Sequence, residues 1–376
     1  MRWTTPFIAA CWLAASAPRA ATPPPPGPSQ QPAPAVSPQS TATDRECLGC
    51  HAAAATAVNG AMATRASERQ FARRAFGEPH GDRFFDTSCA GCHVSRCSDC
   101  HGEAAHPKGK PSDAACLRCH RGYFVGWDYH GRAPREDNER YQREPTADGE
   151  PYLKMLPDVH LERGMGCADC HSPHAATAEA RTKTCRQCHP RPSPEVPDHA
   201  IAAHLDRMEC VACHAAWAPQ EYGTFLVRTY TPEQDEAFAA LPAWGEWTKS
   251  AYLKRQDAPP LGLNAAGRVA PIRPQFILFA TDARQGWENR LLAAEWRAFT
   301  PHTTRRGSVV CAGCHEAPRR YLLEDDEDRL YLLEKDGLPL RSFWSRKGQT
   351  VSNGSFLPEA HHTLMNRRTP EYVRQH

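Results

Sequence analysis

The chain has 376 residues, enough for two or three domains, and its formal net charge is +2. Such a balance lacks the basic surplus of nucleic-acid-binding proteins, so no nucleic-acid partner is expected. No stretch after residue 21 approaches the roughly 18 apolar residues of a membrane-spanning helix. The 17 cysteines stand in a chain too long to be a small disulfide scaffold.

Residues 1–21 have the pattern of an export signal. Arg2 supplies the positive start, Phe7–Ala15 is mostly apolar, and small residues follow as far as Ala20–Ala21. The residues around Cys11 also resemble a lipoprotein cleavage box. Because the apolar run continues past Cys11, a lipid anchor there is the less favoured interpretation.

Residues 22–43 form a proline-rich linker. Thr22–Pro38 contains eight prolines, and no charged side chain occurs from Ala20 to Thr43. A segment of this composition tends to polyproline II and cannot bury a core. We expect a disordered spacer between the export signal and the folded part.

Sixteen of the 17 cysteines belong to one pattern, Cys-x-x-Cys-His, which occurs eight times. This spacing lets two thiols add to the vinyl groups of one haem while the histidine becomes the proximal ligand of the iron. Zinc sites and redox dithiols share the Cys-x-x-Cys part, but neither requires a histidine after every second cysteine. The cysteine pairs, in order, are Cys47 and Cys50, Cys89 and Cys92, Cys97 and Cys100, Cys116 and Cys119, Cys167 and Cys170, Cys185 and Cys188, Cys210 and Cys213, and Cys311 and Cys314. The motif histidines are His51, His93, His101, His120, His171, His189, His214 and His315.

These motifs, spread over residues 47–315, resemble those of the multihaem c-type cytochromes. The resemblance implies eight covalent haem c groups with their iron, export to the periplasm or outer membrane, and redox protein partners. It extends to two subgroups. One contains periplasmic and outer-membrane electron carriers. The other, more distant, contains octahaem enzymes related to tetrathionate reductase and hydroxylamine oxidoreductase, which act on small sulfur or nitrogen oxyanions.

Eleven histidines lie outside the motifs and are candidates for the distal ligand of an iron. His376 ends the chain, and the adjacent His361 and His362 lie far along the C-terminal tail, so we set these three aside. Eight candidates then remain for eight haems: His80, His106, His130, His160, His174, His199, His204 and His302.

The local sequence of some candidates is informative. His174 follows His171 after a serine and a proline, so it can reach a neighbouring haem. His199 and His204 flank four residues typical of a short helix, and at this spacing they could serve two haems. Methionine is more often core filler, so the methionines of this region are left unassigned.

The motif spacing also predicts the architecture. Residues 44–214 carry seven motifs, or about one per 24 residues, too little chain for an ordinary core. We therefore expect a mainly α fold, with much irregular chain wrapped around stacked haems. A few short strands and a β-hairpin are expected in the C-terminal half.

Residues 215–310 hold no motif but five of the nine tryptophans. Thr224–Tyr230 and Gln275–Phe279 are typical of strands, and Gly286–Phe299 fits an amphipathic helix. A cover over haem faces is the favoured role, ahead of a module that shapes a substrate pocket or docks a partner. Residues 311–376 contain the eighth motif and a hairpin predicted over Asp328–Phe343.

The sequence favours an electron carrier. The alternative is an octahaem oxidoreductase with one catalytic haem, and no catalytic residue is assigned. No motif ends in lysine, so the hallmark of one group of nitrite reductases is missing. A purely structural filament subunit is a third possibility.

Overall fold

The computed structural model describes residues 47–88, 96–102, 109–118, 120, 128–130, 152–154, 158–175, 181–190, 192–216, 218–239, 243–244, 246–307, 309–324, 346 and 349–375. The export signal, the linker, the second motif (Cys89–His93) and the expected hairpin over Asp328–Phe343 lie outside these residues. Asp336–Gly337, the expected turn of that hairpin, lies outside them too.

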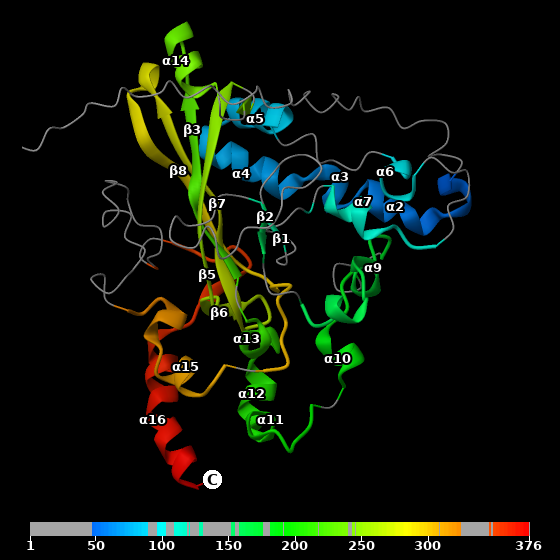
Figure 1. Cartoon of the computed structure of the whole chain (residues 1–376), viewed down its shortest axis with the longest axis vertical. Coiled ribbons are helices and arrows are strands. Elements are labelled where there is room, and N and C mark those ends of the chain that lie inside the picture. Colours follow the sequence, from blue (N-terminus) through cyan, green and yellow to red (C-terminus); the bar gives the residue numbers. More distant parts are fainter. Residues whose placement is uncertain are drawn as a thin grey trace, which may run out of the picture. The chain divides into compact units, whose positions relative to one another are not determined.

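The first half of the described chain consists mainly of short helices (Figure 1, blue to green). Prolines and glycines interrupt the chain every few residues, so most helices have only one or two turns. They are η1 (Ala52–Ala54), α2 (Ala55–Val58), α3 (Ala61–Thr64), α4 (Ala66–Phe76), α5 (His80–Ser88), α6 (Ser98–His101), α7 (Asp113–Leu117), η4 (Leu161–Arg163), α9 (Cys167–Cys170), α10 (Cys185–Cys188), α11 (Pro197–Ala200), α12 (Ala202–Arg207) and α13 (Val211–His214). A two-stranded antiparallel ribbon, β1 (Asp128–His130) with β2 (Tyr152–Lys154), lies between α7 and η4 in the sequence.

Each of the seven described motifs closes one helical turn. In every case the histidine N–H donates to the carbonyl of the first cysteine, at 2.7–3.0 Å. Residues i, i+3 and i+4 share one face of a helix, so this turn presents two thiols and an imidazole on the same side in the six motifs whose cysteines are both described. The local geometry is therefore the one that attachment to a flat macrocycle needs.

The second half is built on a seven-stranded mixed sheet, whose long strands are green to yellow in Figure 1. The order is β4-β5-β3-β7-β6-β9, with β8 paired to β7 beside this path; β3 and β7 are parallel and the other pairs antiparallel. The strands are β3 (Ala218–Arg228), β4 (Ala243–Trp244), β5 (Trp247–Asp257), β6 (Leu261–Asn264), β7 (Val269–Asp282), β8 (Trp287–Ala298) and β9 (Gly354–Phe356). The helices of this half are α14 (Pro232–Phe238), η6 (Ala283–Gln285), α15 (Ala312–His315), η7 (Pro318–Tyr321) and α16 (Glu359–Gln375).

Alternate residues of β7 bury into two different apolar clusters. Ile277 and Phe279 pack with Trp296, whereas Leu278 and Ala280 pack with Phe85 of α5. Successive side chains of a strand point to opposite faces, so both faces of this part of the sheet are covered. The long helices α4 and α5 supply part of one cover through their phenylalanines.

The predicted strand over Gln275–Phe279 is confirmed as part of β7, and the one over Thr224–Tyr230 is confirmed as far as Arg228, where β3 ends. The predicted helix over Gly286–Phe299 is wrong, because these residues form β8 and pair with β7. Leu291 packs into one cluster and Leu292 into the other. Burial on two faces removes the strict alternation of a strand, and the remaining apolar spacing resembles that of a helix.

The fold class is thus confirmed in part. Short helices and irregular chain dominate the motif-bearing half, but the C-terminal half holds long strands in a mixed sheet rather than a few short ones. The chain is therefore not mainly α. Within the described ranges no helix combines the length and apolar character needed to span a bilayer.

Candidate cofactor sites

Five motif histidines each face a histidine from outside the motifs. The ring centres are 5.7–6.1 Å apart, and the ring planes are tilted by 36–55°. The pairs are His101 with His174, His189 with His160, His171 with His302, His214 with His199, and His315 with His204. Each pair combines one motif histidine with one of the predicted distal candidates.

The narrow range of these distances has a simple chemical meaning. A metal–imidazole bond is about 2 Å long and the ring centre lies about 1 Å beyond the nitrogen, so two imidazoles on opposite sides of one metal have centres roughly 6 Å apart. The five pairs have this separation. With two cysteines on the same helical turn as one member, the residues fit a haem held by two thioethers and two axial histidines.

Hydrogen bonds at the Nδ1 atoms orient several of these rings. The Nδ1 of His204 lies 3.2 Å from the carbonyl oxygen of Asp198, and that of His214 lies 3.1 Å from the carbonyl oxygen of Arg305. A carbonyl can only accept, so both rings carry a proton on Nδ1, which leaves Nε2 as the atom available to a metal. A histidine that ligates a metal commonly has this arrangement.

Hydroxyl groups occupy the same position at two other rings. The Nδ1 of His171 lies 3.1 Å from Thr182 Oγ1, and that of His315 lies 2.8 Å from Thr369 Oγ1. Burial lowers the pKa of both histidines, and His204 lowers that of His315 further. Both rings are therefore neutral at pH 7, as a metal ligand must be.

The carboxylate of Asp158 anchors His160. Its Oδ1 accepts from the backbone N–H and the ring Nδ1 of His160, both at 2.8 Å, and its Oδ2 accepts from the Thr304 N–H at 2.7 Å. Burial acts to raise the pKa of Asp158, but these hydrogen bonds outweigh it and the pKa is lowered. The ionised carboxylate fixes the orientation of the His160 ring.

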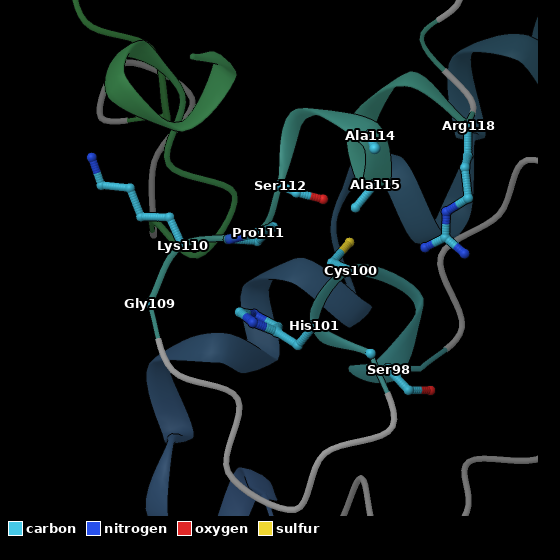
Figure 2. Close-up of a pocket in the computed structure, with 11 residues that line it drawn as sticks. Ser98, Cys100, His101, Gly109, Lys110, Pro111, Ser112, Ala114, Ala115 and Arg118 are labelled. Atoms are coloured by element: carbon cyan, nitrogen blue, oxygen red, sulfur yellow. The ribbon is translucent and has the colours of Figure 1, made fainter. Parts of the chain in front are cut away.

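The third motif lines a cavity of about 520 Å³. Figure 2 shows Cys100 and His101 on one side of it and the start of α7, with Ser112 and Ala115, on another. This volume lies within the range of roughly 300–1,000 Å³ typical of small-molecule and cofactor sites. Arg118, inside the fourth motif, also lines the cavity, so the third and fourth motifs share its walls.

The described cysteines are all free, and several lie beside a cysteine of the next motif. The thiols of Cys185 and Cys210 hydrogen-bond each other, which raises the pKa of Cys185 and lowers that of Cys210 to about 6. Burial, a hydrogen bond to Asp113 and the adjacent Cys116 raise the pKa of Cys167 to about 12. Consecutive motifs therefore lie side by side.

Three of the predicted distal ligands are not found in such pairs. His80 is exposed at the first position of α5, and no described motif histidine faces it. His106 lies outside the described residues, and only the backbone of His130, in β1, is described. Three motif histidines lie outside the five pairs. Of these, His51 and His120 are described and His93 is not. His51 lies close enough to His174 to lower its pKa, after burial and His101.

The three histidines set aside have different positions. His361 is exposed on α16, whereas His362 is buried on the same helix and its ring centre lies 5.0 Å from that of Tyr321. The partner of His315 is His204 rather than either of them. His376 lies outside the described residues.

Sequence reasoning missed the residues that support the pairs, chiefly Asp158, Thr182 and Thr369. Asp158 precedes His160 by two residues, and this short-range spacing is the one signal that could have identified it. Thr369 is 54 residues from His315, so only the fold brings the two together. His199 and His204 were expected to flank one helix, but they lie on two, because α11 ends before Ile201 and α12 begins after it.

No cluster of three or more histidine, cysteine, aspartate or glutamate side chains surrounds a common metal position in the described part of the chain. A haem iron takes at most two ligands from the protein, because the macrocycle supplies the other four, so it needs no such cluster. Comparison of the chain with protein-family models, curated proteins and solved structures gave no match.

Proposed function

We propose that this protein is a multihaem c-type cytochrome that carries electrons through eight covalently bound haems. The observation that supports this most directly is the set of five histidine pairs, each formed at a Cys-x-x-Cys-His turn with ring centres 5.7–6.1 Å apart. A fold without a metal has no reason to repeat this distance at five motifs. The repetition matches the ligand set of a low-spin haem.

Haem, when bound, supplies an iron that accepts and releases one electron. The protein's own residues would hold it at fixed positions. The cysteine pairs would attach it, the paired histidines would ligate its iron, and groups such as Asp158 and Thr369 keep the imidazoles in orientation. An iron with two histidine ligands would have no open position for a substrate, so these five sites suit electron transfer rather than catalysis.

The proposal includes a location and partners. The export pattern of residues 1–21 agrees with the attachment of haem c outside the bacterial inner membrane. The protein would then work in the periplasm or at the outer membrane, between a redox protein that donates electrons and another that accepts them.

The test is to express the full chain in a bacterium that attaches haem c and to characterise the purified protein. We expect a mass increase of eight haems, and electron paramagnetic resonance spectra dominated by low-spin ferric iron. Replacing a paired histidine, as in His199→Ala, should convert one site to high-spin iron. His361→Ala, at an exposed histidine on α16, is the matched control and should leave the spectrum unchanged.

Two results would contradict parts of the proposal. A chain that binds zinc or no cofactor at all would refute haem attachment. A high-spin signal near one iron in eight in the unaltered protein would show an open site and favour the alternative, an oxidoreductase that acts on a small sulfur or nitrogen oxyanion. The site would then belong to the first, second or fourth motif, which are outside the five pairs.

A further inference from the structure

We infer that the haems of motifs three to eight form a single file in the order of the sequence, so that electrons enter at one end and leave at the other. This inference rests on the proposed function and adds the order of the sites to it. It is carried by contacts between consecutive motifs and by the origin of each distal histidine.

Motifs three, four and five are joined by contacts between their helical turns. Cys100 and His101 of motif three line one cavity together with Ala115 and Arg118 of the turn that carries motif four. The backbone N–H of Cys167 donates to Asp113 Oδ1, at 2.8 Å, which ties motif five to the helix that carries motif four.

Motifs five to eight continue the same pattern. The backbone N–H of Lys183, two residues before motif six, donates to the Cys170 carbonyl oxygen of motif five at 2.9 Å. The Arg186 side chain of motif six donates to the Leu205 carbonyl oxygen of α12, just before motif seven, at 2.5 Å. The backbone N–H of Val309, two residues before motif eight, donates to the Cys213 carbonyl oxygen of motif seven at 3.2 Å. Each motif from three to seven is therefore tied to the next one along the sequence.

The distal histidines cross from one motif to another and link the sites further. His174 follows motif five but faces motif three, and His160 precedes motif five but faces motif six. His199 and His204, both between motifs six and seven in the sequence, face motifs seven and eight. Each such histidine fixes one site relative to its neighbours, so the file is held by the chain itself.

The two ends of the file differ in their surroundings. Beyond motif three lies motif one, whose His51 is near His174, and the Thr56 hydroxyl of α2 donates to the His174 carbonyl oxygen at 2.9 Å. Motif eight lies against α16 through Thr369 and against the sheet through the cluster of Ala212, Leu261 and Cys314. The proposed ends of the path are therefore next to α2 and α3 and next to α16.

The test is to follow one electron along the file in the haem-loaded full chain. A ruthenium photosensitiser is attached to a cysteine introduced at the exposed Glu371 of α16, close to motif eight. On excitation the label gives one electron to a ferric haem, and ascorbate then reduces the oxidised label. Electron traps are placed one at a time by the changes His204→Met, His199→Met, His160→Met, His302→Met and His174→Met, because a methionine ligand raises the haem potential and changes its absorption.

The time that the electron takes to reach the trap should increase in the order of motifs eight, seven, six, five and three. The matched control moves the label to the exposed Ala61 of α3, which should reverse this order. Equal arrival times, or a different order, would overturn the file. Iron positions from anomalous diffraction of the unaltered holoprotein provide a second measurement if a methionine variant loses its haem. A protein with eight haems whose irons do not follow the order three to eight would refute the file and leave the proposed function standing.

Discussion

The sheet and the stretch that carries motifs three to six differ in what fills their interiors. The sheet has an apolar core in which Ile272, Phe279 and Trp296 are almost completely buried. Among the described residues from 96 to 210, no apolar side chain is buried, and the one buried residue is Asp158. The sheet can therefore fold on apolar burial, whereas under the proposed function the motif stretch would obtain its stability from the haems that its histidines and cysteines would hold.

Motifs seven and eight belong to both regions. Ala212 of α13 and Cys314 of α15 are buried with Leu261 of β6 and Tyr321 of η7. Arg320, also buried, donates to the carbonyl oxygen of Ala212 at 3.2 Å. The sheet thus provides a fixed base for the last two sites, and the earlier sites extend from it through contacts between motifs.

The largest effect should follow from withholding haem, because the described part of the motif stretch has no apolar core to replace it. This experiment directly compares the motif stretch with the sheet. In a chain produced without haem attachment, the amides of residues 158–210 should exchange hydrogen at nearly unfolded rates, while those of β3, β7 and β8 stay protected. Hydrogen exchange followed by mass spectrometry measures both regions in one sample, with the holoprotein as control. Equal protection of the two regions would show that the motif stretch folds without cofactor.

Truncating a core side chain of the sheet should have the opposite effect, destabilising the sheet and leaving the motif stretch unchanged. Trp296→Ala removes a fully buried side chain and should lower the free energy of unfolding by about 3–5 kcal/mol. The low-spin spectra of motifs three to six should not change, because the buried cluster around Trp296 contains none of the described residues of those motifs. Thermal unfolding gives the first quantity and electron paramagnetic resonance the second. Trp287→Ala, at a half-buried residue of the same strand, should lower the free energy of unfolding clearly less. An equal loss of stability in the two variants would contradict the assignment of the core.

Sequence alone predicted the motif region better than the sheet. A motif needs only five consecutive residues, so the helical turn that unites Cys97 and His101 follows from local spacing. The choice of distal candidates used the simple excess of histidines, and five of the eight lie opposite a motif histidine. Which histidine faces which motif could not be predicted, because His302 and His171 are more than a hundred residues apart.

The sheet was harder because its pattern depends on tertiary contacts. Leu291 and Leu292 of β8 bury on opposite faces, so the periodicity that distinguishes a strand is lost. The parallel pairing of β3 with β7 requires a long crossover through β4, β5 and β6, which no local signal specifies. Short-range chemistry determines the motif turns, and long-range packing determines the sheet.

Asp158→Asn should weaken the motif stretch by a smaller amount. Losing the charge that accepts from His160 and Thr304 should cost about 1–3 kcal/mol at pH 7. The folded pKa of Asp158 is lowered, so its stabilisation is present above the unfolded value of about 4 and is lost as the pH falls through the folded pKa. The stability gap between the two proteins should therefore close on acidification, as thermal unfolding from pH 7 to pH 3 would show.

A matched change at Glu162 of η4, four residues from Asp158, separates this effect from general acid sensitivity. Glu162 is exposed and lies 3.5 Å from Arg305, so Glu162→Gln should change stability little at any pH. Asp158→Asn should also raise the midpoint potential of the sixth site, since the variant lacks the negative charge beside His160 that favours the oxidised iron. A gap independent of pH would contradict the role given to the carboxylate.

The smallest expected effect concerns the junction of the two regions at motif eight. Thr369 Oγ1 bonds both the Met365 carbonyl oxygen, at 2.9 Å, and His315 Nδ1, at 2.8 Å. Thr363 Oγ1, in the same helix, makes only the corresponding bond to the Glu359 carbonyl oxygen, at 3.1 Å, among the contacts of the described chain. Thr369→Val should therefore lower the free energy of unfolding by more than Thr363→Val does. The difference is the contribution of one hydrogen bond, about 0.5–1.5 kcal/mol, and thermal unfolding measures it. Because His315 then loses the group that orients its ring, Thr369→Val alone should also shift the low-spin signal of one iron. If both variants behaved alike, α16 would pack beside motif eight without orienting its ligand.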